Sequence, residues 1–127
     1  MKNYDEIIDG IESISDNQRR LKYSALASSL PLISVIRKLI YRKNEGKKPF
    51  TPEFSFEKKV RLLDDANNDL QKILSAELLD CLHAVERLND IRQISLLASQ
   101  EIKNESLKGD FLFVIRQIDN IIVILKA

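Results

Sequence analysis

The sequence has few of the residues on which metal sites and covalent cross-links depend. It contains one cysteine, Cys81, and one histidine, His83, among 127 residues. A structural zinc site takes three or four Cys or His ligands, so these two residues cannot supply one. A single cysteine also cannot close a disulfide within the chain. The sequence therefore predicts no bound metal and no disulfide framework.

Glycine and proline are also scarce, with three residues of each. Gly10, Gly46 and Gly109 are too far apart to form a glycine-rich loop that cradles phosphates, which disfavours nucleotide and dinucleotide cofactors. A sandwich or barrel of short strands needs far more turn residues. We therefore expect an all-α fold: one domain spanning residues 1–127, built as an antiparallel bundle of four to five helices without a cofactor.

Apolar residues between positions 7 and 39 recur at helical spacing. This pattern predicts one long first helix, or two in line with a restart capped by Asp16. Pro31 removes a backbone donor inside the pattern, so we expect a kink or break near Leu30. Residues 44–46, which include a glycine, are expected to end the helix.

The middle of the chain predicts one short and one long helix. Ser55 is a candidate N-cap for a helix over residues 56–66, and the Asn-Asn-Asp sequence at 67–69 is a natural break. We expect Ser75 to cap the longest helix, over residues 76–103, whose apolar positions from Leu78 and Leu82 onward follow the helical period.

The last predicted helix has more apolar surface than one bundle core can cover. We expect a loop at 104–109, a cap at Asp110 and a helix over 111–126. Its apolar residues occupy more than half of its circumference, whereas a bundle helix buries about a third to a half. Either this helix lies in the middle of the bundle or a second copy covers its other face, and we favour the symmetric dimer.

Charge is balanced overall but segregated along the chain. The net charge is +1, yet residues 15–48 contain nine basic and two acidic residues, a difference of 9 − 2 = +7. This segment can face phosphates or an acidic protein. The alternative is a solvated helix end, where cations suit the helix dipole. The candidate binding residues here are Arg37, Lys38, Arg42, Lys43, Lys47 and Lys48, to which Lys58, Lys59 and Arg61 can add.

Two stretches resemble HEPN-like helical proteins, including the mannitol operon repressor group. They are Phe54-Ser55-Phe56-Glu57-Lys58-Lys59-Val60-Arg61-Leu62-Leu63 and Glu86-Arg87-Leu88-Asn89-Asp90-Ile91-Arg92. In that family a short helix opening with "FSF-KI-L" precedes a long helix carrying "L--IR". The resemblance covers residues 54–92 and implies a helical bundle that pairs face to face, with Arg92 near the pairing groove.

The sequence departs from the nuclease members of that family. Those members cut RNA with an Arg and a His four to six residues later, but here residues 93–99 read Gln-Ile-Ser-Leu-Leu-Ala-Ser. Without an imidazole, no general acid or base near neutral pH is present there. Arg92 is therefore a candidate binding residue, for an anion or a dimer contact, or it forms a salt bridge with Asp90 or Glu86.

The function expected from these observations is non-enzymatic. We expect a helical binding or regulatory module, such as a regulator, an antitoxin-like protein or an inhibitor in a bacterial or phage system. The expected partners are another protein and a second copy of this chain, with RNA as an option for the basic segment. One alternative is a HEPN-type ribonuclease that uses Arg92 with Asn89 or Ser95, and another is a small helical subunit of a ribonucleoprotein complex.

The N-terminus, the apolar stretch near the C-terminus and the surroundings of His83 bear on localisation and on catalysis. The N-terminus lacks the cationic start and apolar run of a secretory signal, so we expect a cytoplasmic protein. Polar residues interrupt the apolar stretch 111–125, so no membrane span is expected. His83 lies near Asp80, Glu86 and Arg87 in sequence, and we interpret this group as a solvated helix face because no nucleophile motif accompanies it.

Overall fold

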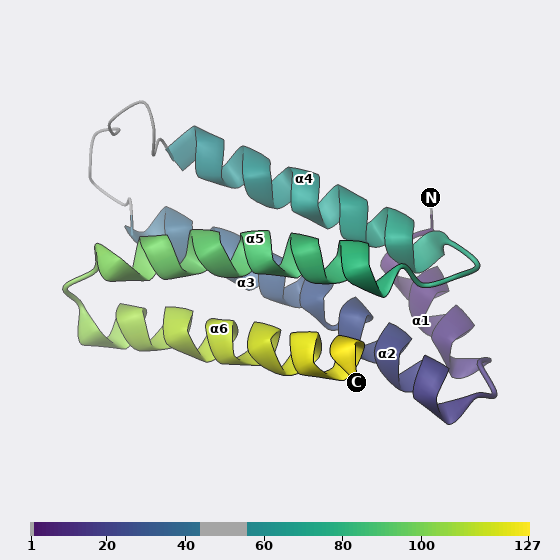
Figure 1. Ribbon diagram of the computed structural model, residues 1–127. Helices are drawn as coiled ribbons and strands as arrows, with labels where there is room; N and C mark the ends of the chain where they lie inside the picture. Colours follow the sequence, from purple (N-terminus) through teal and green to yellow (C-terminus); the bar gives the residue numbers. More distant parts are fainter. Residues whose placement is uncertain (1, 44–55) are drawn as a thin grey trace.

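The computed structural model describes residues 2–43 and 56–127, and within them it contains helices and no strands (Figure 1). The all-α fold class is therefore confirmed. Only Ser28 separates the second helix from the third, so the two together form one bent rod. The helices are α1 (Tyr4–Glu12), α2 (Asn17–Ala27), α3 (Ser29–Lys43), α4 (Phe56–Ser75), α5 (Cys81–Gln100) and α6 (Glu105–Lys126).

Four of these helices, α3 to α6, form an antiparallel bundle. Each runs opposite to the one before it, and the pairs α3 and α4, α4 and α5, α5 and α6, and α3 and α6 pack together (Figure 1). The helix α2 continues α3 beyond the bundle and packs on α6, and α1 packs on α2. One end of the bundle holds the end of α3 and the start of α4, and the opposite end holds the connection between α4 and α5.

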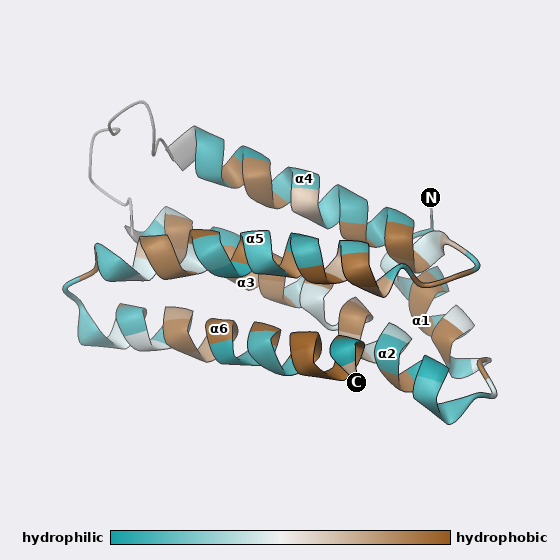
Figure 2. Cartoon of the chain, in the orientation of Figure 1, coloured by the Kyte–Doolittle hydropathy of each residue, from teal (hydrophilic) through white to brown (hydrophobic). Residues whose placement is uncertain are grey.

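The core draws on every helix. Hydrophobic residues lie along the inward sides of the helices, and polar residues lie outside (Figure 2). The large side chains that are almost completely buried come from α2, α3, α4, α5 and α6, and they are Leu26, Ile36, Ile40, Leu63, Leu70, Leu88, Ile91, Phe111 and Ile118. Because these residues recur at helical spacing, burial of one apolar face per helix accounts for the bundle.

The expected restart and break in the first part of the chain are both confirmed. The Asp16 carboxylate accepts a hydrogen bond from the backbone N–H of Arg19 at 2.9 Å and so caps α2. The chain breaks at Ser28, and Pro31 then lies in the first turn of α3, where backbone N–H groups have no partner within the helix. The predicted helix end at 44–46 and the cap at Ser55 lie outside the described residues.

The predicted break at residues 67–69 is wrong. Helix α4 continues through these residues to Ser75, which ends the helix instead of capping the next one. Two fully buried leucines, Leu63 and Leu70, lie on either side of the Asn-Asn-Asp sequence and on the same helical face. Burial of that face outweighs the low helix propensity of the three polar residues.

The predicted start of the helix over residues 76–103 is also wrong, and this helix, with 20 residues, is shorter than α6, with 22. Helix α5 begins at Cys81, and Asp80 caps it by accepting a hydrogen bond from the backbone N–H of His83 at 3.0 Å. Leu78 therefore lies in the connection before the helix, and Leu82 lies on its outer side. Both leucines are 81% exposed, so neither belongs to the core as predicted.

Helix α6 begins earlier than predicted. Residues 105–109 are helical rather than a loop, and Asn104 supplies the cap by accepting a hydrogen bond from the backbone N–H of Leu107 at 3.0 Å. Leu107 is buried, which ties the extra turn to the core. Asp110 consequently lies inside α6 and does not cap it.

Most of the apolar surplus of α6 is covered within the chain. The helix packs against α5, α3 and α2, so three neighbours bury its apolar residues. What remains exposed is Leu112, Phe113 at 60% and Val123 at 67%. The central position in the bundle thus accounts for most of the excess, and the dimer stays a prediction.

One helical stretch has the length and composition of a membrane span. Within Asn17–Arg42, a stretch of 26 residues that forms α2 and nearly all of α3, the most apolar 18-residue window has a mean hydropathy of 1.2. Half of the apolar window is buried inside the bundle, and core helices often meet this criterion. The expected cytoplasmic location stays a prediction.

Candidate anion-binding surface

The outer side of α3 carries three of the predicted binding residues together. Arg37 reaches towards α4 and forms an ion pair with Asp64, and Arg42 reaches towards α6, where its Nη1 lies 3.5 Å from Oδ2 of Asp110. Lys38 lies between them in sequence and is exposed. We call Arg37, Lys38 and Arg42 the basic face of α3.

The two ion pairs on this face hold their arginines weakly. The side chains of Arg42 and Asp110 are 57% and 51% exposed, and those of Arg37 and Asp64 are 39% and 46% exposed. Solvent and salt screen such pairs, whose contribution is about 0–1 kcal/mol. A phosphate or carboxylate of a partner can therefore replace Asp64 or Asp110 at little cost.

The start of α4 adds cations to the same end of the bundle. Lys58 and Arg61 are exposed, whereas Lys59 is nearly buried and its Nζ lies 3.9 Å from Oε2 of Glu101. The first turns of a helix favour carboxylates, because the helix dipole is positive there. The dipole therefore explains cations near the end of α3 but not those at the start of α4.

Not all predicted binding residues can be placed. Lys47 and Lys48 lie outside the described residues, and Lys43 is described only as the last residue of α3. Arg92 belongs to α5, and its Nε donates to Oδ1 of Asp119 in α6 at 2.7 Å. The structure thus places Arg37, Lys38 and Arg42 along α3, with Arg37 turned towards α4 and Arg42 towards α6, and it places Arg92 elsewhere, on the seam between α5 and α6.

The surroundings of Arg92 bear on the alternative ribonuclease site. Ser95 is completely buried, and its hydroxyl donates to the carbonyl of Ile91 at 2.9 Å, so it does not reach a surface substrate. Asn89 is exposed. The salt bridge predicted for Arg92 exists, but its partner is Asp119 rather than Asp90 or Glu86. Arg92 and Asp119 thus form an ion pair between α5 and α6.

His83 is next to a small network of charged groups. Its Nε2 lies 3.8 Å from Oδ2 of Asp69, and the same carboxylate oxygen lies 3.9 Å from Arg87, which also pairs with Asp90 at 3.3 Å. The imidazole is 44% exposed, so this is a partly solvated contact between α4 and α5. Within residues 2–43 and 56–127, no three His, Cys, Asp or Glu side chains gather to hold a metal ion.

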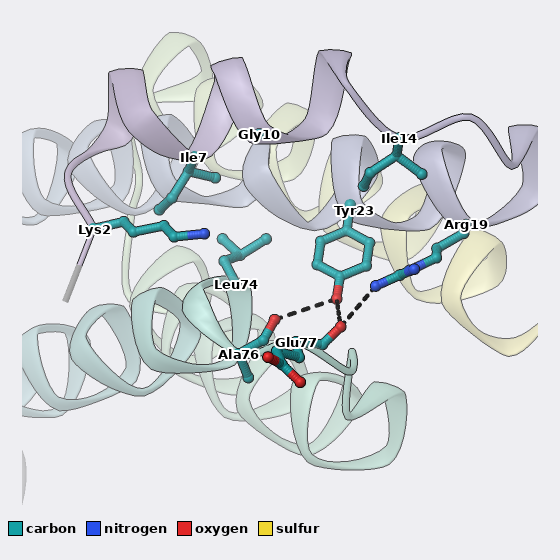
Figure 3. A pocket seen from close by; sticks show the side chains of 9 residues that line it. All are labelled: Lys2, Ile7, Gly10, Ile14, Arg19, Tyr23, Leu74, Ala76 and Glu77. Atoms are coloured by element: carbon teal, nitrogen blue, oxygen red, sulfur yellow. Dashed lines mark hydrogen bonds between the residues drawn. The ribbon is translucent and has the colours of Figure 1, made fainter.

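A small hollow lies where α1 and α2 meet the end of α4 (Figure 3). Its volume is about 160 Å³, smaller than the roughly 300 Å³ of typical small-molecule sites. The hydroxyl of Tyr23 donates to the carbonyl of Glu77 at 3.2 Å, and a guanidinium nitrogen of Arg19 donates to the same oxygen at 2.7 Å (Figure 3). These bonds fasten α2 to the connection after α4, so we assign this hollow a structural role.

Sequence reasoning missed one feature of the surface. Leu78 in the connection between α4 and α5 and Leu82 in the first turn of α5 are exposed at the end of the bundle opposite the basic face of α3. The signal was present in the sequence, because Asp80 followed by a helical stretch is a regular N-cap pattern. A cap at Asp80 instead of Ser75 places Leu78 before the helix, whereas the exposure of Leu82 follows only from the packing of α5.

Comparison with known proteins adds no family assignment. No protein-family model, curated protein or solved structure matches this chain.

Proposed function

We propose that this protein is a non-enzymatic helical module that binds an anionic macromolecule through the end of the bundle where α3 finishes and α4 begins. The observation that carries the proposal is the gathering of cations from two helices at that end. Lys38 and Arg61 are exposed there, and no described carboxylate lies within ion-pair distance of either.

The chemistry of this surface suits a phosphate backbone or an acidic protein. Arginine and lysine side chains that are exposed and weakly paired can exchange an internal carboxylate for an external anion. Tyr41 is 53% exposed on the same helix and offers an aromatic ring, on which an unpaired base stacks favourably. A regulator, an antitoxin-like protein and a ribonucleoprotein subunit all fit this mode of binding.

The experiment compares two charge reversals in one helix. Arg61→Glu removes a cation from the proposed surface, and Lys72→Glu makes the same change in net charge near the other end of α4. Binding of a fluorescent single-stranded RNA and of a fluorescent acidic peptide is measured by anisotropy at low and at moderate salt. We expect Arg61→Glu to weaken binding of at least one probe about tenfold, Lys72→Glu to leave it nearly unchanged, and salt to weaken it steeply.

This pair of variants separates binding from folding. Arg61 is exposed, so Arg61→Glu removes no buried contact and should not destabilise the protein. If neither probe binds the wild-type protein at low salt, or if both variants weaken binding equally, the proposed surface is wrong. Cleavage of the RNA probe that is lost in Arg92→Ala would instead support the ribonuclease.

A further inference from the structure

The connection between α4 and α5 and the first turn of α5 carry the two most exposed large apolar side chains of the described residues. Leu78 and Leu82 are four residues apart and are each 81% exposed. Figure 2 shows this connection as a hydrophobic segment at the end of the bundle. Scattered exposed leucines are ordinary, but two neighbouring ones beside a hollow form a continuous feature.

Leu78 forms part of the wall of that hollow, and Leu82 directly follows Cys81, which also lines it. The hollow has a volume of about 520 Å³, and its walls include Lys22 and Tyr23 of α2 together with Leu78, Leu79 and Cys81. It is open to solvent on one side, so an apolar side chain from outside can enter it. A projection and a hollow thus lie next to each other on one surface.

The charges of this surface complement each other. The side chains on the α2 side of the hollow are Arg19 and Lys22 against one carboxylate, Asp16, and are therefore net positive. The Lys22 ammonium donates one hydrogen bond to the backbone carbonyl of Ala127 at 2.9 Å, and it has further N–H groups that can face a carboxylate of a second copy. The connection carries two exposed acids, Glu77 and Asp80. Opposite charges on two sides of a single surface meet when two copies face each other across a two-fold axis, because each copy presents both sides.

We propose that a second copy of this chain docks on this end of the bundle, with Leu78 and Leu82 of each copy entering the hollow of the other. The acidic connection of one copy then faces Lys22 on α2 of its partner, and the reverse contact follows by symmetry. Such a contact is closed, so the assembly stops at two copies.

This arrangement has a consequence for the proposed binding surface. The basic face of α3 lies at the opposite end of the bundle from the connection between α4 and α5 (Figure 1). The dimer would therefore carry one basic end at each of its two extremities. A long polyanion that reaches both ends binds more tightly than a short one, because the second contact is intramolecular.

The test measures mass in solution by light scattering over a range of protein concentrations. We expect the wild-type protein to reach twice 14.6 kDa as concentration rises. The double variant Leu78→Ser/Leu82→Ser should raise the dissociation constant at least about tenfold, as expected when central apolar contacts are lost. The matched control Phe113→Ser/Val123→Ser removes two other exposed apolar side chains, on α6, and should leave the dimer intact.

A charge exchange gives a second measurement. Glu77→Lys should weaken the dimer, and the double variant Lys22→Glu/Glu77→Lys should recover it, since the opposite charges meet again. The hydrogen bonds from Arg19 and Tyr23 go to the backbone carbonyl of Glu77 and survive the substitution. A mass of 14.6 kDa at all concentrations overturns the proposal. So does a dimer that the α6 variant dissociates and the leucine variant does not.

Discussion

Phe111 is the largest side chain of the described residues with no exposed surface, and it lies in α6 among residues from neighbouring helices. Replacing it with alanine removes its burial and leaves a cavity that the bundle can only partly close. We expect Phe111→Ala to lower the free energy of unfolding by about 3–5 kcal/mol. Denaturant unfolding followed by circular dichroism measures this change.

Phe113 provides the control for that prediction. It lies two residues along the same helix, but it is 60% exposed. Phe113→Ala should change the free energy of unfolding by about 0.5 kcal/mol or less, since little packing is lost. Equal effects of the two substitutions would mean that α6 is rotated relative to this structure.

Ion pairs between distant residues show the limit of sequence reasoning at this scale. The sequence suggested Asp90 or Glu86 for Arg92 because they lie within about a helical turn or two. The structure instead pairs Arg92 with Asp119, which lies 27 residues further along. Arg37 likewise pairs with Asp64 across two helices. The relative register of two packed helices decides such contacts, and a helical period alone does not specify register.

At the scale of helices, the sequence predicted the helical segments better than their boundaries. The periodic apolar residues correctly predicted helices in all the described regions. The break at 67–69 was wrong because the Asn-Asn-Asp sequence was taken as a helix breaker, and the loop at 104–109 was too long because the cap was assigned to Asp110. Buried apolar residues on both sides held the first segment in α4, whereas in the second Asn104 served as an N-cap. Short polar runs thus have different structural roles, and the apolar residues around them decide which.

Gly109 provides a test of the revised boundary of α6. In this structure it lies inside the helix, and a Cβ added there would meet no atom within 4 Å. Glycine within a helix is less favourable than alanine by about 0.5–1 kcal/mol, because it loses more backbone freedom on folding. Gly109→Ala should therefore raise the free energy of unfolding by about that amount.

Thermal or denaturant unfolding of Gly109→Ala gives the answer directly. If Gly109 instead lay in a loop with a left-handed backbone, Gly109→Ala would lower the free energy of unfolding, because alanine is strained in that conformation. Gly10 lies inside α1 and is equally free of neighbours, so Gly10→Ala should shift stability in the same direction. Destabilisation by Gly109→Ala would instead support the loop that the sequence predicts at residues 104–109.

At the scale of the molecule, composition alone predicted an all-α bundle, since a sandwich or barrel of short strands needs more turn residues than the chain contains. The basic segment was also visible, because charge segregation along one helix survives folding. The hollow lined by α2, Leu78 and Cys81 was not visible, since it exists only through the packing that brings α2 beside the start of α5. Surfaces formed by two or more helices depend on packing, which periodicity does not describe.

The packing of α2 and α3 also bears on whether this chain enters a membrane. One 18-residue window within Asn17–Arg42 has the length and composition of a membrane span, but α3 supplies Ile36 and Ile40, which are completely buried in the bundle. Moving this stretch into lipid would remove it from α4 and α6 and expose their apolar faces to water, at a cost of about 25 cal/mol for each Å². We therefore expect the full-length chain, expressed in cells and fractionated without detergent, to stay in the supernatant after ultracentrifugation. Retention in the membrane pellet after an alkaline carbonate wash would show instead that the stretch leaves the bundle, because that wash releases proteins held only at the surface.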